Sequence, residues 1–380
     1  MRSGTRAGIR KCRRVLVKIG SQVLTTERGL NNRVIERLCD DMSLLMDRGR
    51  EFALVTSGAI AEGRAIMRVK EADISLSKKQ ALAAIGQGSL MRAYTDAFRR
   101  YGYTAAQILI TREDLDNRRR YLNIRNTLSS LFEMGAVPII NENDTVAVEE
   151  IQFTDNDMLS AMILPLVEAH VLVILTDMEG VYSKDPKIHD DAEIVHEIAE
   201  LRPKDIRGYG DGGNRLGRGG IASKLEAAYR ASMLGVPTVI ASAYTPQVIS
   251  SILEGSQVGT FIHPKKKAQL TQKDHWLGFV SRPKGKVVID DGAAAMILGR
   301  GKSLLPVGVV DVSGSFKAGD PVEIVKRDGT PIAVGLSNFA TEEVVKIMGA
   351  STSELSMILR YDCDDEVVHR NNMIVRKETF

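Results

Sequence analysis

The sequence predicts an α/β protein in which a three-layer αβα sandwich surrounds a mostly parallel sheet and a small β-rich domain follows. Two observations carry this prediction. Short apolar runs alternate with segments of helical periodicity over about the first 260 of the 380 residues, which is typical of βαβ units. Beyond residue 263, short apolar runs separated by glycines about every ten residues are typical of a small β domain.

The first part begins with a strand and continues as alternating helices and strands. The run 14–20 is apolar and ends in glycine, as expected of a buried strand before a turn. The next segment, 31–49, places Val34, Leu38 and Leu45 on one helical face and closes with a glycine. Further strands are predicted over 51–58, 103–111, 136–141, 170–177 and 236–241, and helices over 77–101, 121–134, 157–167 and 221–234.

The second part begins after a polar, charged run over 264–273, which is typical of a linker. Short strands are predicted over 286–290, 308–312, 321–325 and 331–335, and their glycine punctuation favours a small barrel or sandwich. The predicted domains are therefore 1–265 and 284–380, joined by a linker over 266–283.

Composition and charge exclude several classes of protein. Apolar residues make up 44% and charged residues 26%, as in ordinary folded proteins. The net charge of +3 argues against a bulk nucleic-acid binder or a polybasic membrane protein. Cys12, Cys39 and Cys363 lie far apart, which favours the reducing cytoplasm over a disulfide framework or zinc knuckle.

Neither a membrane span nor a targeting signal is predicted. No run approaches the ~20 apolar residues of a transmembrane helix. The basic segment before Arg14 lacks the apolar core of a signal peptide, and we expect it to be a disordered tail.

Polar corners after the predicted strands are the candidate sites, because ligands bind beyond the carboxyl ends of parallel strands. The first corner holds Lys18, Gly20 and Ser21. A glycine lets backbone N–H groups approach an anion, and a lysine supplies positive charge, so this corner could bind a phosphate. The alternative is that Lys18 only extends from the strand end into solvent. The second corner holds Ser57, which we expect either to bind an anion with the next helix or simply to cap that helix.

The third corner is rich in amides and carboxylates. Asn141 to Asp144 follow a predicted strand, and Asp155, Asn156 and Asp157 come shortly afterwards. A solvated loop is the usual fate of one such run. Two runs this close together indicate a ligand with an ammonium group or a magnesium–phosphate site.

Two further corners suit phosphate. Thr176 and Asp177 end a buried strand. The glycine-rich loop 216–220 leads into a helix with Lys224 in its first turn, where N–H groups and an ammonium group can hold an anion together. A flexible loop before a surface helix is the alternative.

Taken together, these corners resemble the amino acid kinase family, and the tail resembles a PUA domain. The run Asn141 to Asp144 followed by Asp155 to Asp157 is the most specific feature, and it favours the branch that acts on L-glutamate. The resemblance covers nearly the whole chain beyond the first dozen residues. The matching segments are 17–20, 55–60, 138–144, 155–161, 175–177 and 219–224, with 288–293 and 303–308 in the tail.

The resemblance implies ATP-dependent phosphorylation of the side-chain carboxylate of L-glutamate. The products would be L-glutamyl 5-phosphate and ADP, in the first step of proline synthesis. The family also implies Mg²⁺ as a requirement, proline as a feedback inhibitor, and a dimer or tetramer.

The resemblance also implies roles for individual residues. Lys18 and Lys224 would neutralise charge on the moving phosphoryl group, and Asp157 would hold both lysines. No general base is needed, because the attacking carboxylate is already ionised at pH 7. The expected glutamate contacts are Ser57, Asn141, Asp144, Asp155 and Asn156; the expected ATP contacts are Lys18, Gly20, Ser21, Thr176, Asp177, Arg218, Gly219, Gly220, Ile221, Ala222, Ser223 and Lys224; no protein metal ligand is expected.

Three positions in two segments depart from the family pattern, and two alternatives stay open. Ser21 and Gln22 stand where the family has Thr-Ser, and Arg218 stands where it has Thr. A related kinase could act on aspartate, N-acetylglutamate or UMP, although the tail and the amide-rich corner favour glutamate. An RNA-binding protein is the other alternative. The tail from Pro264 has 17 Lys plus Arg against 15 Asp plus Glu, which gives RNA binding little support. We hypothesise a regulatory or assembly role for it.

Overall fold

A computed structural model describes residues 4–70, 74–147, 156–208, 220–265 and 271–376. The chain divides into two compact units, residues 1–269 and 270–380. Each unit has its own sheet and its own buried core. Among the helices in these ranges, none has the length and apolar character needed to span a membrane.

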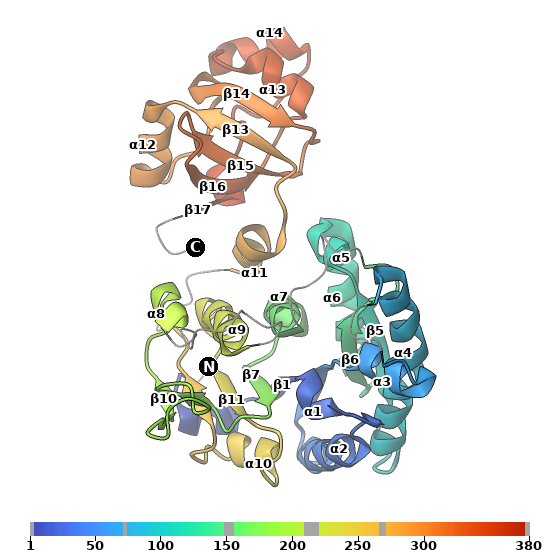
Figure 1. Ribbon diagram of the computed structural model, residues 1–380. Helices are drawn as coiled ribbons and strands as arrows, with labels where there is room; N and C mark the ends of the chain where they lie inside the picture. Colours follow the sequence, from blue (N-terminus) through green and yellow to red (C-terminus); the bar gives the residue numbers. More distant parts are fainter. Residues whose placement is uncertain (1–3, 71–73, 148–155, 209–219, 266–270, 377–380) are drawn as a thin grey trace. The chain divides into compact units, whose positions relative to one another are not determined.

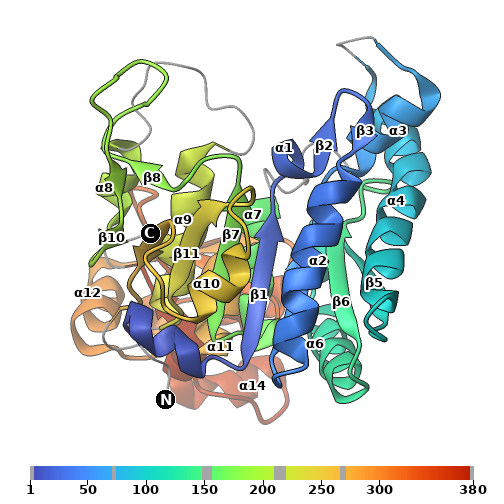
Figure 2. The ribbon, with the colours of Figure 1, turned by 90° about the horizontal axis from the view of Figure 1, so that it is seen from below.

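The first unit contains an eight-stranded sheet with the order β10–β12–β11–β7–β1–β4–β6–β5 (Figure 2). Neighbouring strands from β11 to β5 run parallel, whereas β12 runs antiparallel to β11 near one edge. The predicted mostly parallel sheet is confirmed, although β10 and β12 were not predicted. The strands are β1 Arg14–Ile19, β4 Glu51–Val55, β5 Ala105–Ile110, β6 Val137–Glu142, β7 Val171–Thr176, β10 Glu197–Ile198, β11 Thr238–Ser242 and β12 Thr260–Ile262.

Helices cover both faces of this sheet, which confirms the predicted three layers (Figure 1). On one face lie α2 Asn32–Met46, α4 Leu76–Arg99 and α10 Val248–Leu253; on the other lie α6 Arg118–Glu133, α7 Asn156–Val167, α8 Pro203–Gly208 and α9 Ile221–Met233. The smaller elements are α1 Ser21–Leu24, α3 Ala59–Met67, α5 Arg112–Asp116, the hairpin β2 Thr25–Thr26 with β3 Gly29–Leu30, and the hairpin β8 Val181–Tyr182 with β9 Ile194–Val195.

The core of this unit forms around the central strands. β1 lies between β4 and β7 and is buried from Val15 to Ile19, because helices cover the sheet on both sides. The predicted face of α2, with Val34, Leu38 and Leu45, packs into the same core. The central strands are therefore rigid supports for whatever follows their carboxyl ends.

The chain changes direction across the sheet at β1. After β1 it places β4, β6 and β5 on one side, and from β7 onward it places β11 and β12 on the other. Open α/β sheets bind ligands beyond the strand ends at such a switch point. The predicted polar corners follow β1, β4, β6 and β7, so the topology brings them to one region.

Close contact with α4 fixes the position of α3. A Cβ atom on Gly86 would lie 1.9 Å from the carbonyl oxygen of Ala59, and one on Gly63 would lie 1.9 Å from that of Leu82. Only glycine fits at both positions, so the two helix backbones touch. Because α3 starts just after Ser57, this contact also fixes the second corner.

The segment before β1 differs from the prediction. Residues Arg6–Lys11 form a 3₁₀ helix with Ile9 fully buried, so the expected disordered tail is wrong for the described residues. The guanidinium group of Arg6 donates to four backbone carbonyls, at 2.6 Å from His196, 2.8 Å from Val258, 3.0 Å from Ser256 and 3.3 Å from Gly259. The Arg6 side chain therefore holds the segment before β1 against residues 196 and 256–259, a contact that composition alone could not predict.

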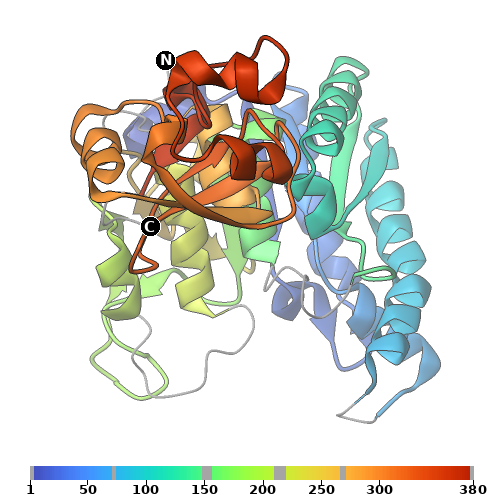
Figure 3. The same cartoon turned by 90° about the horizontal axis from the view of Figure 1, so that it is seen from above.

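The second unit (orange to red in Figure 1 and Figure 3) contains one five-stranded sheet, ordered β14–β13–β15–β16–β17. The described residues of this unit form one sheet, which contradicts the two sheets of a sandwich but not a barrel. In this sheet β13 pairs parallel with β15, and the other pairs are antiparallel. The elements are β13 Gly285–Ile289, α12 Asp291–Arg300, η3 Pro306–Gly308, β14 Val309–Gly314, β15 Pro321–Lys326, β16 Pro331–Leu336, α13 Thr341–Ile347, η4 Thr352–Glu354, α14 Leu355–Leu359, η5 Arg370–Asn372 and β17 Met373–Val375.

The four strands predicted in this part all form, and β17 joins them from much later in the chain. Before β13, residues 272–280 form the helix α11 Gln272–His275 and a π-helical turn, Trp276–Val280. Trp276 and Leu277 are buried, so this segment packs as part of a folded unit.

Candidate active site

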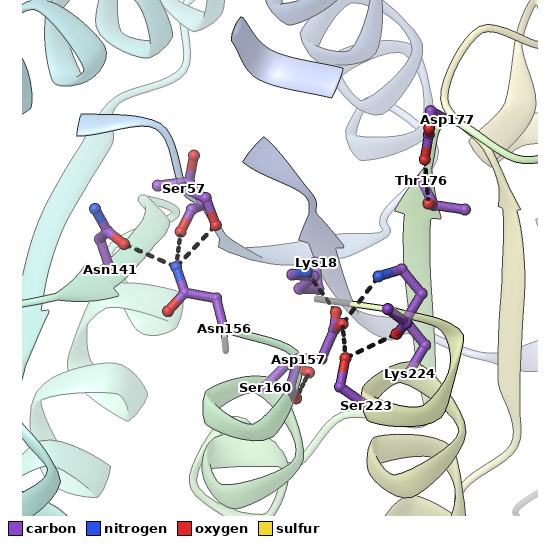
Figure 4. Close-up of polar contacts among 12 residues, drawn as sticks. Lys18, Ser57, Asn141, Asn156, Asp157, Ser160, Thr176, Asp177, Ser223 and Lys224 are labelled. Atoms are coloured by element: carbon purple, nitrogen blue, oxygen red, sulfur yellow. Dashed lines mark hydrogen bonds and ion pairs between the residues drawn. The ribbon is translucent and has the colours of Figure 1, made fainter. Parts of the chain in front are cut away.

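A buried ion-pair cluster lies beyond the carboxyl end of β1 (Figure 4). The Lys18 ammonium lies 2.5 Å from Asp157 Oδ1, and the Lys224 ammonium lies 3.1 Å from Asp157 Oδ2. The side chains of Lys18, Asp157 and Lys224 are 3%, 0% and 8% exposed. One carboxylate therefore holds two ammonium groups in a nearly dry place.

Three separate elements bring these residues together. Lys18 is the next-to-last residue of β1, Asp157 lies in the first turn of α7, and Lys224 lies in the first turn of α9. α7 and α9 pack against each other on one face of the sheet. A buried charge costs several kcal/mol unless it is paired, so the three side chains depend on one another.

Two serines also contact Asp157. Ser223 Oγ lies 3.0 Å from Asp157 Oδ2 and 2.9 Å from the carbonyl oxygen of Gly220. Ser160 Oγ donates to the backbone carbonyl of Asp157 at 2.6 Å. Ser223 was predicted as an ATP contact, and the structure also places it as a neighbour of the carboxylate. These bonds fix the orientation of Asp157 within α7.

A second polar group lies at the ends of β4 and β6 (Figure 4). The amide of Asn156 donates to the carbonyl of Thr56 at 2.5 Å, to Ser57 Oγ at 2.9 Å and to Asn141 Oδ1 at 3.0 Å. Asn141 also accepts from the backbone N–H of Glu142 at 2.9 Å. Ser57, Asn141 and Asn156, three of the predicted glutamate contacts, thus form one network.

Sequence reasoning missed two members of this network, both from α4. The Asn141 amide donates to Gln87 Oε1 at 2.9 Å, and Tyr94 OH lies 2.9 Å from Thr56 Oγ1. The signal was present, since Gln87 is a polar residue on the side of α4 that also buries Leu90 and Tyr94. A polar residue on an apolar helix face calls for a partner.

The corner after β1 uses its backbone differently from the prediction. The N–H of Gly20 donates to the carbonyl of Leu175 at 3.1 Å, so it is not directed at a ligand, and the expectation for this group is wrong. Ser21 begins α1 and is exposed. A Cβ on Gly20 would lie 3.6 Å from the carbonyl oxygen of Leu175 and 3.9 Å from Lys18 Nζ, so there is room for a small side chain at this position.

The end of β7 carries a third polar group (Figure 4). Thr176 Oγ1 donates to Asp177 Oδ1 at 2.9 Å. With its NH₂ group assigned toward Asp177, the amide of Gln22 donates to both carboxylate oxygens at 3.2 Å. Gln22, which departs from the family pattern, thereby ties α1 to the end of β7.

The other predicted residues are not part of these groups, and Ser57 has a further outcome to report. Asp144 lies in the loop after β6, where burial raises its pKa to about 6, and within the described ranges no hydrogen bond joins it to the Asn156 network. Ser57 does not cap α3, because Gly58, with φ of 103°, occupies the N-cap. Gly220 caps α9, whose first turn includes Ile221 and Ala222; Asp155, Arg218 and Gly219 lie outside the described residues.

The cluster has an excess of positive charge at the sheet's switch point. Two ammonium groups face one carboxylate, so the three side chains together carry about +1 in a site that excludes water. Fixed charge in such a place attracts an anion strongly and stabilises negative charge that develops during a reaction. Among the described residues, no group of three or more His, Cys, Asp or Glu side chains could hold a metal ion.

Comparison with known proteins places this geometry in context. Residues 13–242 match the amino acid kinase family, and residues 285–359 match the PUA domain. The chain is 44% identical over 368 residues to a protein of Geobacter metallireducens named glutamate 5-kinase, covering 97% of this chain and 98% of that protein. A protein of the same name in Geobacter sulfurreducens is 42% identical, and the match covers 99% of this chain and 100% of that protein. Another in a Thermoanaerobacter species is 44% identical, and the match covers 97% of this chain and 99% of that protein.

Proposed function

The chain belongs to the amino acid kinase family, and we propose that it phosphorylates the side-chain carboxylate of L-glutamate with ATP. The products are L-glutamyl 5-phosphate and ADP, which makes this the first step of proline synthesis. The observation that carries the proposal is the buried cluster of Lys18, Asp157 and Lys224. The substrate follows from the close relatives, which are named glutamate 5-kinase and match over nearly the whole chain.

The chemistry needs little beyond positioning and positive charge. A carboxylate oxygen of glutamate attacks the γ-phosphorus of ATP, and the bond to the β,γ-bridging oxygen breaks as ADP leaves. The acceptor is ionised at pH 7, so no residue has to remove a proton. Charge spreads over the phosphoryl oxygens in the transition state, and Lys18 and Lys224 stabilise it.

Asp157 acts as a positioning residue in this proposal. It keeps both ammonium groups in place before the substrates arrive, so no reorganisation is needed during transfer. Ser223 and Ser160 hold the carboxylate and its backbone in turn.

The network at the ends of β4 and β6 is the proposed acceptor site. Ser57, Asn141 and Asn156 present hydroxyl and amide groups suited to carboxylates and an ammonium group. We assign Asp144 and Asp155 to the same site, where a carboxylate would pair with the substrate ammonium.

The corners after β1 and β7 and the start of α9 form the proposed nucleotide site. One side of it is formed by Ser21, Thr176 and Asp177. The other side is formed by the N–H groups at the start of α9, which belong to Ile221, Ala222 and Ser223 and follow Gly220. We assign Arg218 and Gly219 to the same side. Mg²⁺ belongs to the substrate MgATP, since it keeps several waters and binds phosphates with one or two carboxylates.

We also propose a domain organisation for the chain. Residues 1–265 form the kinase domain and 284–380 the PUA domain with its tail. The segment 266–283 joins them, and its residues 272–280 are helical. Proline as a feedback inhibitor, a cytoplasmic location and a dimer or tetramer complete the proposal.

The test is ADP release from MgATP with L-glutamate, L-aspartate, N-acetyl-L-glutamate and UMP offered separately. Each acceptor is assayed with and without hydroxylamine, which traps an acyl phosphate as a hydroxamate. Turnover with glutamate together with a hydroxamate is the expected result. Turnover only with another acceptor would keep the family and overturn the substrate, and no turnover with any acceptor would overturn the proposed activity.

A further inference from the structure

A short hairpin connects the two halves of the proposed site. The hairpin Thr25–Leu30 follows α1 directly, so it continues the nucleotide corner. Its second strand packs on α3, the helix that begins beside the acceptor residue Ser57 (Figure 2). Movement of this hairpin therefore affects both the nucleotide corner and the acceptor corner.

Two glycines let the hairpin and α3 approach very closely. A Cβ on Gly58, at the N-cap of α3, would lie 2.9 Å from Thr25 Cγ2. A Cβ on Gly29, in the hairpin, would lie 2.5 Å from Glu62 Oε2 and 3.1 Å from Ala65 Cβ. Both glycines have φ above 100°, so side chains are disfavoured there by conformation as well as by space. The contact is a built interface.

A charged side chain of α3 bonds directly to the hairpin. Glu62, in the first turn of α3, accepts the backbone N–H of Leu30 at 2.7 Å. Its own N–H bonds to the carbonyl of Gly58, so it belongs rigidly to the start of the helix. Glu62 and Leu30 also line a hollow of about 300 Å³, together with Glu36 and Arg100.

The hairpin is also tied to the nucleotide side. Thr25 Oγ1 donates to the carbonyl of Ser21 at 2.8 Å, and the N–H of Asn31 donates to the carbonyl of Leu24 at 2.8 Å. A continuous chain of bonds thus runs from Ser21 through Thr25 and Leu30 to Glu62 and the acceptor corner.

We propose that Glu62 is a positioning residue that couples the nucleotide corner to the acceptor corner by clamping the hairpin Thr25–Leu30 on α3. This inference rests on the proposed function, because it assigns the two corners to MgATP and glutamate. Phosphoryl transfer requires the two substrates at near-contact distance, and a displacement of about 1 Å can cost about 10²-fold in rate. A clamp between the corners also makes the binding of each substrate favour the binding of the other.

The test uses the full chain and two variants that separate the acceptor oxygen from the charge. Glu62→Gln keeps an oxygen that can accept the Leu30 N–H, whereas Glu62→Asp keeps the charge but is too short to reach it. Glu27→Ala is the matched control, because Glu27 is exposed in the turn of the same hairpin. Dissociation constants of the magnesium complex of a non-hydrolysable ATP analogue are measured by calorimetry with and without glutamate, alongside kcat and both KM values.

The coupling ratio, the factor by which glutamate tightens analogue binding, should exceed about fivefold in the unaltered chain. It should fall toward one in Glu62→Asp, with a loss of kcat, and be largely retained in Glu62→Gln and Glu27→Ala. A side chain that only stabilises the fold would shift the unfolding midpoint and leave this ratio unchanged. An unchanged ratio and kcat in Glu62→Asp would overturn the inference, as would equal losses in Gln and Asp variants or the absence of coupling in the unaltered chain. Failure of the unaltered chain to turn over glutamate would instead overturn the proposed function.

Discussion

Replacing Lys224 by methionine tests the centre of the proposed mechanism. Methionine keeps most of the length and apolar stem of the side chain but removes the ammonium group. The loss of one preorganised group that stabilises transition-state charge typically costs about 10²–10³-fold in kcat, or about 2.7–4 kcal/mol. We expect Lys224→Met to show a loss of this size, with smaller effects on the KM for glutamate.

The effect on stability should be smaller than that of a fully broken buried ion pair, which costs about 3–5 kcal/mol. Asp157 keeps Lys18 at 2.5 Å and Ser223 at 3.0 Å after the change, so its charge stays paired. We therefore expect the free energy of unfolding to fall by about 1–3 kcal/mol, the range for losing one partner of a buried polar group.

The assay is steady-state ADP release at saturating MgATP and glutamate, with urea unfolding of the same preparations. Lys204→Met serves as the control, because Lys204 is exposed on α8, the neighbour of α9. A kcat within about threefold of the unaltered value in a folded Lys224→Met protein would refute the assignment of this lysine to the phosphoryl group.

Three further predictions concern the support of the site. Gly86→Ala should lower the free energy of unfolding in urea by about 1–3 kcal/mol or more, because its Cβ would lie 1.9 Å from the carbonyl oxygen of Ala59. Gly88→Ala is the control, because Gly88 faces open space on the same helix, and it should raise the free energy of unfolding by about 0.5–1 kcal/mol. Similar effects of the two changes would contradict the close contact between α3 and α4. Asp41→Ala should cost about 1–3 kcal/mol in the same measurement, since the buried Asp41 carboxylate accepts two backbone N–H groups at the start of α10; a change below about 0.5 kcal/mol would count against this. Burial raises the pKa of Asp144 to about 6, so kcat/KM for glutamate should fall about tenfold per unit below pH 6, and this slope should vanish in Asp144→Asn. Because the folded state then binds the proton more tightly than the unfolded chain, the Asp144 contribution to the free energy of unfolding should increase as the pH falls from about 6 to 4, opposite to the usual carboxylate.

The sequence predicted the first unit well, because its strands and helices carry strong local signals. The runs containing Lys18 and Thr176 are continuous apolar strands followed by polar residues, and parallel topology then requires their ends to meet. The meeting of Lys18, Asp157 and Lys224 thus followed from periodicity and the family pattern together. Contacts within one corner were harder to predict. The N–H of Gly20 bonds to Leu175 instead of facing an anion, and of the two alternatives for Ser57 the structure excludes the helix cap.

Contacts between residues far apart in the chain could not be predicted from local patterns. The docking of Arg6 on carbonyls some 190 to 253 positions away has no local signal, since composition shows only a basic segment. The Gln22 contact with Asp177 and the fit of Gly86 against α3 likewise depend on the packing of distant elements. β12 joins the sheet antiparallel, which a pattern of βαβ units does not suggest.

The charge count at the site links stability to function. Burying Lys18 and Lys224 is unfavourable, and pairing with Asp157 offsets part of that cost. Three elements, β1, α7 and α9, hold the three charged side chains in place. In the proposed mechanism both ammonium groups are held in position before ATP binds. The proposal thus assigns the charges that are costly to bury to the stabilisation of the phosphoryl group, which is how an electrostatically preorganised site uses folding free energy for catalysis.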